Sequence, residues 1–227
     1  MKIIKFKDDL HFKKNIDYDC NLILTNDKLI KKMNFPNSLG LLYSAFTLFT
    51  GFKINSGEYK MMGLAPYGRP IYVDLILKKL IDIKEDGSID INQNYFSYIN
   101  GSAMTNKNFA DLFGGPARAP ESKITQREMD IACSIQKVTE KIVFRMARYT
   151  KKLTGADYLC LAGGVALNSV VNGHLLAENL FKDIWIQPAA GDAGSSLGCA
   201  LDLYHSYLNN PRNLREDGKS IQLGSYW

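Results

Sequence analysis

Residues 158–168 read YLCLAGGVALN, and this stretch decides the fold that we expect. A short continuous apolar run, residues 158–162, is typical of a strand that is buried on both faces. Two glycines then end the strand, and the following residues, 168–180, suit a helix. A second short strand at residues 184–186 and a second helix at residues 193–208 follow. This strand–helix–strand–helix order predicts an α/β fold with parallel strands.

Two further helices are predicted upstream of that stretch. Thr125 and Glu128 have the spacing of a capping box, so the longer helix is expected to begin after Thr125. Its apolar residues recur at steps of three and four, and Gly155 suits the C-terminal stop. The other helix spans residues 39–51, with Ser38 as the N-cap. Its apolar part is too short to cross a membrane and suits a buried helix.

The remaining segments are punctuated by turn residues. Residues 55–70 hold three glycines and two prolines and cannot form one regular element. Residues 73–83 have the pattern of a helix, and residues 95–123 are rich in loops. Hairpins are expected in two places, at residues 21–33 and at residues 84–94.

We divide the chain into three parts on this basis. Residues 1–33 are expected to be an N-terminal segment, a hairpin with a frayed start, because they carry much of the positive charge. Residues 34–208 are expected to form the main domain, and residues 209–227 a C-terminal linker.

Composition excludes several classes of protein. The chain has 227 residues, of which 46% are apolar and 22% charged, so it is neither wholly disordered nor collagen-like. The net charge is +5, but residues 1–34 hold eight lysines against five acids, which leaves the body nearly neutral. A nucleic-acid partner is therefore not expected. Four cysteines without a CxxC pair and an N-terminus without an apolar signal segment favour the cytoplasm.

The first candidate site is residues 161–168, LAGGVALN. Glycines between a strand and a helix let backbone N–H groups approach an anion, and ligands of α/β sheets bind beyond the carboxyl ends of strands. The alternative is a tight turn that needs a positive φ angle. The stretch is neither a phosphate-binding P-loop nor a GxGxxG fingerprint, so its spacing alone favours the turn.

Two other stretches carry candidate side chains. In residues 187–198, Asp192 suits a metal ligand through its oxygens or an N-cap of the next helix, and the residues alone favour the cap. In residues 57–68, Lys60 suits a phosphate or carboxylate partner, or an exposed pair with Glu58. The three histidines form no ligand pair at helical spacing.

Four stretches in this order resemble the nodulation-protein and antibiotic-tailoring O-carbamoyltransferases. They are residues 38–47 (SLGLLYSAFT), 57–68 (GEYKMMGLAPYG), 161–168 (LAGGVALN) and 187–194 (QPAAGDAG). FGGP at residues 113–116 and SIQKVTE at residues 134–140 lie between them. The resemblance covers roughly residues 34–226 and only part of the family's length.

The resemblance implies a two-domain enzyme. Its larger domain is of the actin, sugar-kinase and chaperone type, a ribonuclease-H-like nucleotide-binding fold, and its smaller domain is YrdC-like. Carbamoyl phosphate and ATP would give carbamoyladenylate, and the carbamoyl group would pass to a hydroxyl of an acceptor, often a sugar. A divalent metal, taken to be iron, would be held by two histidines of an H-x-x-x-H motif and by one aspartate.

The resemblance also assigns roles to residues of this chain. Asp192 would be the metal-ligating aspartate and, with Lys60, a catalytic residue. Glu58, Lys60 and Gly63 would line the same cleft. Four residues would hold the nucleotide phosphates: Gly163, Gly164, Val165 and Asn168.

The chain departs from the family in what it lacks. It has no H-x-x-x-H pair, no YrdC-like domain, and Asn37 where the family usually has histidine. We therefore expect an incomplete ATP-dependent O-carbamoyltransferase chain. Two alternatives are a subunit that needs a separately encoded complementing chain and a non-catalytic nucleotide-binding remnant.

Overall fold

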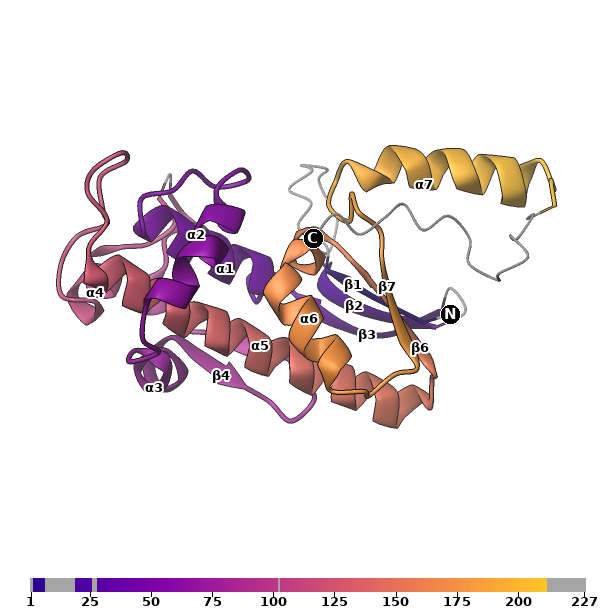
Figure 1. Ribbon diagram of the computed structural model, residues 1–227, viewed down its shortest axis with the longest axis horizontal. Helices are drawn as coiled ribbons and strands as arrows, with labels where there is room; N and C mark the ends of the chain where they lie inside the picture. Colours follow the sequence, from indigo (N-terminus) through magenta and orange to yellow (C-terminus); the bar gives the residue numbers. More distant parts are fainter. Residues whose placement is uncertain (1, 7–18, 26–27, 102, 212–227) are drawn as a thin grey trace.

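A computed structural model of the chain describes residues 2–6, 19–25, 28–101 and 103–211. A five-stranded sheet and a two-stranded sheet lie among its helices (Figure 1). Most of the predicted linker, residues 209–227, and the predicted turn at residues 26–27 lie outside the described residues. Among the described residues, no helix is both long enough and apolar enough to cross a bilayer.

The larger sheet has the strand order β3-β2-β1-β6-β7. β2 runs antiparallel to both of its neighbours, whereas β6 is parallel to β1 and to β7. The predicted α/β fold with parallel strands is therefore confirmed. The strands are β1 (Lys2–Phe6), β2 (Asp19–Thr25), β3 (Lys28–Asn34), β6 (Tyr158–Ala162) and β7 (Asp183–Ile186).

The N-terminal residues correct one expectation. The hairpin predicted at residues 21–33 is present as β2 and β3, and residues 2–6 form a paired strand where a frayed start was expected. β1 lies between β2 and β6, so its backbone is paired on both sides. Charge was a poor guide because the hydrogen bonds of a strand ladder join backbone groups and do not depend on the charge of the side chains.

The longest helix, α5 (Gln126–Thr154), connects the two ends of the molecule (Figure 1). The predicted capping box of Thr125 and Glu128 is present, and Gly155 ends the helix with a φ of 61°. Its apolar face is fully buried at Ile135, Val138 and Ile142. The helices that follow are α6 (Ser169–Ala177) and α7 (Gly194–Asp202), and a π turn, η5 (Leu203–Tyr207), continues α7.

An aromatic cluster forms the core at the other end of α5. Helix α1 (Leu39–Phe49) begins at the predicted N-cap, Ser38, whose side chain accepts a hydrogen bond from the Leu41 N–H. Phe46 and Phe49 of α1 contact Phe109 and Phe113 with ring centroids 4.9–5.7 Å apart. Phe109 belongs to α4 (Lys107–Leu112), a short helix inside the stretch that was expected to be loop-rich.

The segments between α1 and α4 are short. Residues 55–70 are interrupted as predicted, by α2 (Glu58–Leu64) and η1 (Ala65–Tyr67). The helix predicted at residues 73–83 ends early, because residues 81–83 pair with residues 89–91, so the hairpin predicted at residues 84–94 begins three residues earlier. Residues 73–95 thus contain α3 (Val73–Leu75), the π turn η2 (Ile76–Leu80), β4 (Ile81–Ile83), β5 (Ile89–Ile91) and the 3-10 turn η3 (Gln93–Tyr95).

The capping box predicts a loss of stability in acid. Burial opposes ionisation of Glu128, but hydrogen bonds from Thr125 and Arg127 outweigh burial and lower the pKa of its carboxyl. Because the pKa is lowered on folding, ionised Glu128 stabilises the fold fully above the pKa of the unfolded state, about 4.3. This stabilisation is lost as the pH falls through the pKa of the folded state.

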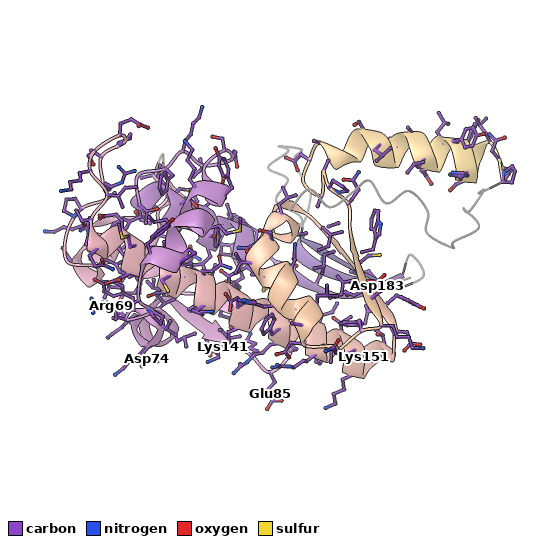
Figure 2. The ribbon with its side chains drawn as sticks, viewed as in Figure 1. Arg69, Asp74, Glu85, Lys141, Lys151 and Asp183 are labelled. Atoms are coloured by element: carbon purple, nitrogen blue, oxygen red, sulfur yellow. The ribbon has the colours of Figure 1, made fainter. Side chains whose placement is uncertain are left out.

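We therefore expect Glu128→Gln to lower the free energy of unfolding by about 1 kcal/mol at pH 7 and by less in acid. Urea unfolding between pH 2.5 and 7 measures this difference. Glu85→Gln, at an exposed position of the hairpin (Figure 2), makes the same change of charge away from the capping box and is the matched control. Equal acid sensitivity in wild type and Glu128→Gln would contradict the assignment.

Candidate functional site

Two glycine-containing loops meet at one edge of the larger sheet. Because β6 and β7 are adjacent and parallel, the loops that follow them leave the sheet at the same edge. The Gly163 N–H donates to the Ala190 carbonyl at 2.7 Å. A Cβ atom at Gly191 would lie 3.7 Å from Leu167 Cδ1 and 4.0 Å from Gly164 Cα. The first and second candidate stretches are therefore in direct contact.

The glycines of the first loop have different environments. Gly163 has a φ of 100°, so the turn needs glycine there, as the alternative interpretation required. Gly164 is exposed and begins a short 3-10 turn, η4 (Gly164–Leu167). Val165, in the same turn, is half-buried. The tight turn and an anion site are compatible, because the conformational need falls on Gly163 and leaves Gly164 accessible.

Asn168 is buried, and both ends of its amide are used inside the protein. Its Oδ1 accepts from the Val171 N–H at 3.1 Å as the N-cap of α6 and from Gln136 Nε2 at 3.0 Å. Its Nδ2 donates to Gln136 Oε1 at 2.9 Å. Asn168 therefore holds the loop against α5, and its side chain is not presented to a ligand.

Tyr43 extends this buried polar chain to α1. Its hydroxyl donates to Gln136 Oε1 at 3.0 Å. Burial first, and then the negative charge of Glu58, raise the pKa of Tyr43 above its usual range, against a lowering by the hydrogen bond with Asn168. Tyr43 thus remains a protonated donor at neutral pH.

Sequence reasoning missed Tyr43 and Gln136 as site residues, although both lie in the stretches that carry the resemblance. Gln136 directly follows Ile135 on the buried side of α5. A polar residue next to apolar positions that face the core was the available signal, because buried polar groups in proteins are almost always hydrogen-bonded.

Glu58, the first residue of α2, is hydrogen-bonded to the middle of α1 and to the backbone that precedes α2. Its carboxylate accepts from Ser44 Oγ at 3.0 Å, from the Asn55 N–H at 2.9 Å and from the Gly57 N–H at 3.2 Å. The negative charge of Glu58 also acts on Tyr43, so Glu58 lies near the hydrogen-bonded side chains of Tyr43, Gln136 and Asn168. Glu58 therefore serves first to fix the start of α2.

Lys60 and Gly63 lie further along α2 and are exposed. A Cβ atom at Gly63 would meet nothing within 4 Å. The link from α2 to the first loop runs through Met62, whose Sδ lies 3.8 Å from the hydroxyl of Ser169 at the start of α6. The structure therefore brings α2 beside the loop, with Lys60 and Gly63 facing outward.

Asp192 is exposed in the second loop. The N-cap of α7 is Ala193 and has no side-chain cap, so the N-cap interpretation of Asp192 is wrong. In the part of the chain that the structure describes, no three His, Cys, Asp or Glu residues gather into a group that could hold a metal ion. One carboxylate supplies too few ligands for a divalent metal, so these residues do not form a metal site by themselves.

Comparison with known proteins identifies the family. Residues 16–201 match the family model described as the carbamoyltransferase N-terminus. The chain belongs to the carbamoyltransferase family. All the candidate site residues, from Glu58 to Asp192, fall within the matched part of this carbamoyltransferase chain.

Three relatives give the scale of the similarity. The uncharacterized protein sll1178 of Synechocystis is 62% identical over 195 residues, which cover 86% of this chain and 31% of that protein. The nodulation protein NolO of Bradyrhizobium diazoefficiens is 38% identical over 79% of this chain and 31% of its own. The nodulation protein NolNO of Sinorhizobium fredii is 37% identical over 74% of this chain and 23% of its own length. The chain therefore spans less than a third of the length of each of these three relatives.

The buried amide pair predicts a large cost for Asn168→Ala. This change removes the N-cap of α6 and leaves the Nε2 group of Gln136 buried without its acceptor, so we expect a loss of about 2–3 kcal/mol in the free energy of unfolding. Tyr43→Phe is the control, because it removes one hydroxyl and leaves the amide pair intact; about 1 kcal/mol is expected. Guanidinium unfolding measures both, and a smaller loss for Asn168→Ala than for Tyr43→Phe would contradict this role.

Proposed function

We propose that this chain supplies the nucleotide-binding part of an ATP-dependent O-carbamoyltransferase. The observation that carries the proposal is the contact between the two glycine-containing loops at the carboxyl edge of β6 and β7, through Gly163 and Ala190. Ligands of α/β sheets bind at such edges. Membership of the carbamoyltransferase family makes the carbamoyl group the one to be transferred.

The order of the strands supports a ribonuclease-H-like domain of the actin and sugar-kinase type. Three N-terminal strands with the middle one reversed are followed by parallel strands reached through helices. A nucleotide-binding domain of this type is expected to have this order and these directions of strands. Because β6 and β7 are parallel, their carboxyl ends lie at the same edge of the sheet, where the two glycine-containing loops begin.

Gly191 gives the proposal a specific physical argument. Its φ angle is not in the left-handed region, and a Cβ atom there would make only ordinary contacts with Leu167 and Gly164. Neither conformation nor packing therefore requires glycine at this position. A glycine at this position would instead allow a phosphate of ATP or carbamoyladenylate to approach the backbone of the second loop closely.

The proposed roles follow from the positions of the residues. Gly163, Gly164 and Val165 would hold the nucleotide phosphates through their backbone, where glycine allows close approach. Asn168 positions these residues through Gln136. Lys60, on the exposed side of the neighbouring α2, would offset phosphate charge.

The Gly63 position would leave the same side of α2 open to the nucleotide, since no neighbouring atom fills it. Glu58 holds that helix in place through Ser44 and the backbone before it.

The reaction would have two steps. In the first, hydrolysis of carbamoyl phosphate would release inorganic phosphate and give carbamate, whose oxygen would attack the α-phosphorus of ATP and release pyrophosphate to form carbamoyladenylate. In the second, the oxygen of an acceptor hydroxyl, such as that of a sugar, would attack the carbamoyl carbon, and AMP would leave. A carbon–oxygen bond forms, the bond to the adenylate phosphate breaks, and the hydroxyl proton is released. Backbone N–H groups aimed at the phosphate would stabilise the charge on the leaving group.

Asp192 as a ligand of a divalent metal, iron by resemblance, stays a prediction. The described residues do not complete such a site, so we derive no step through a metal. The remaining ligands would come from the H-x-x-x-H pair, which this chain lacks.

Titration calorimetry of the full chain with ATP tests the proposed phosphate site. We expect saturable binding that Gly191→Val weakens at least about tenfold, because the added side chain would block close approach of a phosphate to the backbone. Gly173→Ala, at an exposed position of α6 with nothing within 4 Å of the added Cβ, is the matched control. It should bind ATP as the wild type does and gain about 0.5–1 kcal/mol of stability.

Two outcomes would overturn the proposal. Unchanged ATP binding by Gly191→Val would place the nucleotide elsewhere. A folded wild-type chain that binds no ATP would show that this part of the protein does not carry the phosphate site.

A further inference from the structure

A cavity lies between the β4–β5 hairpin and the C-terminal half of α5. Its volume is about 520 Å³. Residues 84–86, in the turn between the two strands, form one wall. Pockets that bind small molecules have volumes of roughly 300–1,000 Å³, so this cavity is large enough for a small ligand. The other wall is made by four residues of α5: Arg145, Arg148, Tyr149 and Lys152.

The two walls of the cavity are joined to each other by close contacts. Gly87, in the hairpin turn, has a φ of 83°, and a Cβ atom there would lie 2.5 Å from the Met146 backbone nitrogen. Only glycine allows the turn to approach α5 so closely. Arg145 Nη1 donates to the Ile83 carbonyl at 2.7 Å and to the Lys84 carbonyl at 3.3 Å. The cavity therefore has its shape before any ligand binds.

Positive charge predominates in the lining. Lys84 and three cations of α5 face two carboxylates, Glu85 and Asp86. Asp86 is ion-paired with Lys31 of β3, so its charge is already compensated from outside the cavity. Glu85 is exposed and extends outward from the hairpin (Figure 2). The two acids therefore do not neutralise the cations of the cavity.

The cations of the lining remain available to a ligand. Lys84 Nζ lies 2.7 Å from a carboxylate oxygen of Asp90, and Arg148 is ion-paired with Glu178. All four of these side chains are at least one third exposed, and ion pairs between exposed side chains contribute little to stability. Neither Arg145 nor Lys152 has an acidic partner among the described residues. A multivalent anion would therefore compete successfully with the acids that are present.

The outer side of α5 adds an energetic reason for an anion. Lys141, Arg145, Arg148 and Lys152 are spaced by four, three and four residues, so they follow one side of the helix. Like charges at these spacings repel and destabilise a helix. The dipole of the helix favours Lys152, in the last turn, but not the cations further from the C-terminus. A bound anion would relieve the repulsion between them.

We propose that this cavity binds a small anion that carries at least two phosphate groups. Guanidinium and ammonium groups bind phosphate through charge-assisted hydrogen bonds. Arg145 and Lys152 are seven residues apart, which is about 10 Å along the helix axis. Two phosphate groups suit this spacing better than one. A small ligand is favoured over a nucleic acid because the cations line a cavity and alternate with acids instead of forming a continuous basic surface.

The proposed anion site is separate from the glycine-containing loops. α5 ends at Thr154 and leads into the amino end of β6, which begins at Tyr158. The cavity adjoins this end of α5, whereas the loops lie at the carboxyl ends of β6 and β7. The two sites therefore lie toward opposite edges of the larger sheet, and the proposed anion site does not rest on the proposed function.

Titration calorimetry of the full chain with inorganic pyrophosphate, at constant ionic strength, tests the proposal. We expect saturable binding at least about tenfold tighter than that of inorganic phosphate. The double variant Arg148→Gln/Lys152→Gln should weaken pyrophosphate binding at least about tenfold, because it removes two cations of the cavity. Both positions are exposed, so the variant should keep the melting temperature of the wild type.

Two controls separate this site from net charge and from the loops. Lys78→Gln/Lys79→Gln removes the same charge at exposed positions of η2 outside the cavity lining, and should bind pyrophosphate as the wild type does. Gly191→Val should also keep pyrophosphate binding, because the second loop lies away from the cavity. Pyrophosphate binding that depends on Arg148 and Lys152 in a chain that binds no ATP would support the anion site and overturn the proposed function.

Several results would overturn the anion site. One is the absence of saturable pyrophosphate binding by the folded wild-type chain. Another is equal weakening by the two lysine-to-glutamine changes at residues 78 and 79, which would make the effect one of net charge. Unchanged binding by Arg148→Gln/Lys152→Gln would place pyrophosphate elsewhere, and tighter binding of citrate than of pyrophosphate would make the ligand a polycarboxylate.

Discussion

The parallel pairing of β6 with β7 is the constraint on which the rest of this structure depends. It directs the chain to the same edge of the sheet twice, so two short loops, more than twenty residues apart, come into contact. The Gly163 N–H to Ala190 carbonyl bond fixes that contact, and the positive φ of Gly163 makes the turn possible. Because backbone groups make this contact, larger side chains are not needed to hold the two loops together, and the contact region is rich in glycine and alanine.

A buried polar chain secures the first loop from behind. Tyr43 on α1, Gln136 on α5 and Asn168 at the start of α6 are joined by hydrogen bonds of 2.9–3.0 Å. Their polar groups are costly to bury unpaired, so the three helices and the loop have one arrangement that satisfies them. Buried side chains thus fix the position of the first loop, while its backbone at Gly164 stays accessible at the edge of the sheet. This division between a fixed interior and an open edge suits a site that binds through its backbone.

The parts that could be predicted from sequence are those set by local chemistry. The capping box at Thr125 and Glu128, the stop at Gly155 and the Ser38 cap are local hydrogen-bonding patterns, and all three are present. β1 was missed because its partners lie about 20 and 160 residues away, so only tertiary pairing stabilises it. The hydrogen bonds of Asn168 could not be predicted for similar reasons: a motif identifies the residue, but only its distant partner, Gln136, shows that the amide faces inward.

The same comparison of local and distant effects explains α7. Its helical period could be predicted from residues 193–208, since periodicity is local, but periodicity does not say what the apolar side packs against. Elsewhere in the chain the corresponding apolar faces, such as that of α5, are buried by partners within the described residues. On α7 the side chains remain exposed although the family match extends through most of the helix. Periodicity therefore predicts that residues 193–208 form a helix, whereas the surface against which a helix packs depends on residues distant in the sequence, as the buried face of α5 shows.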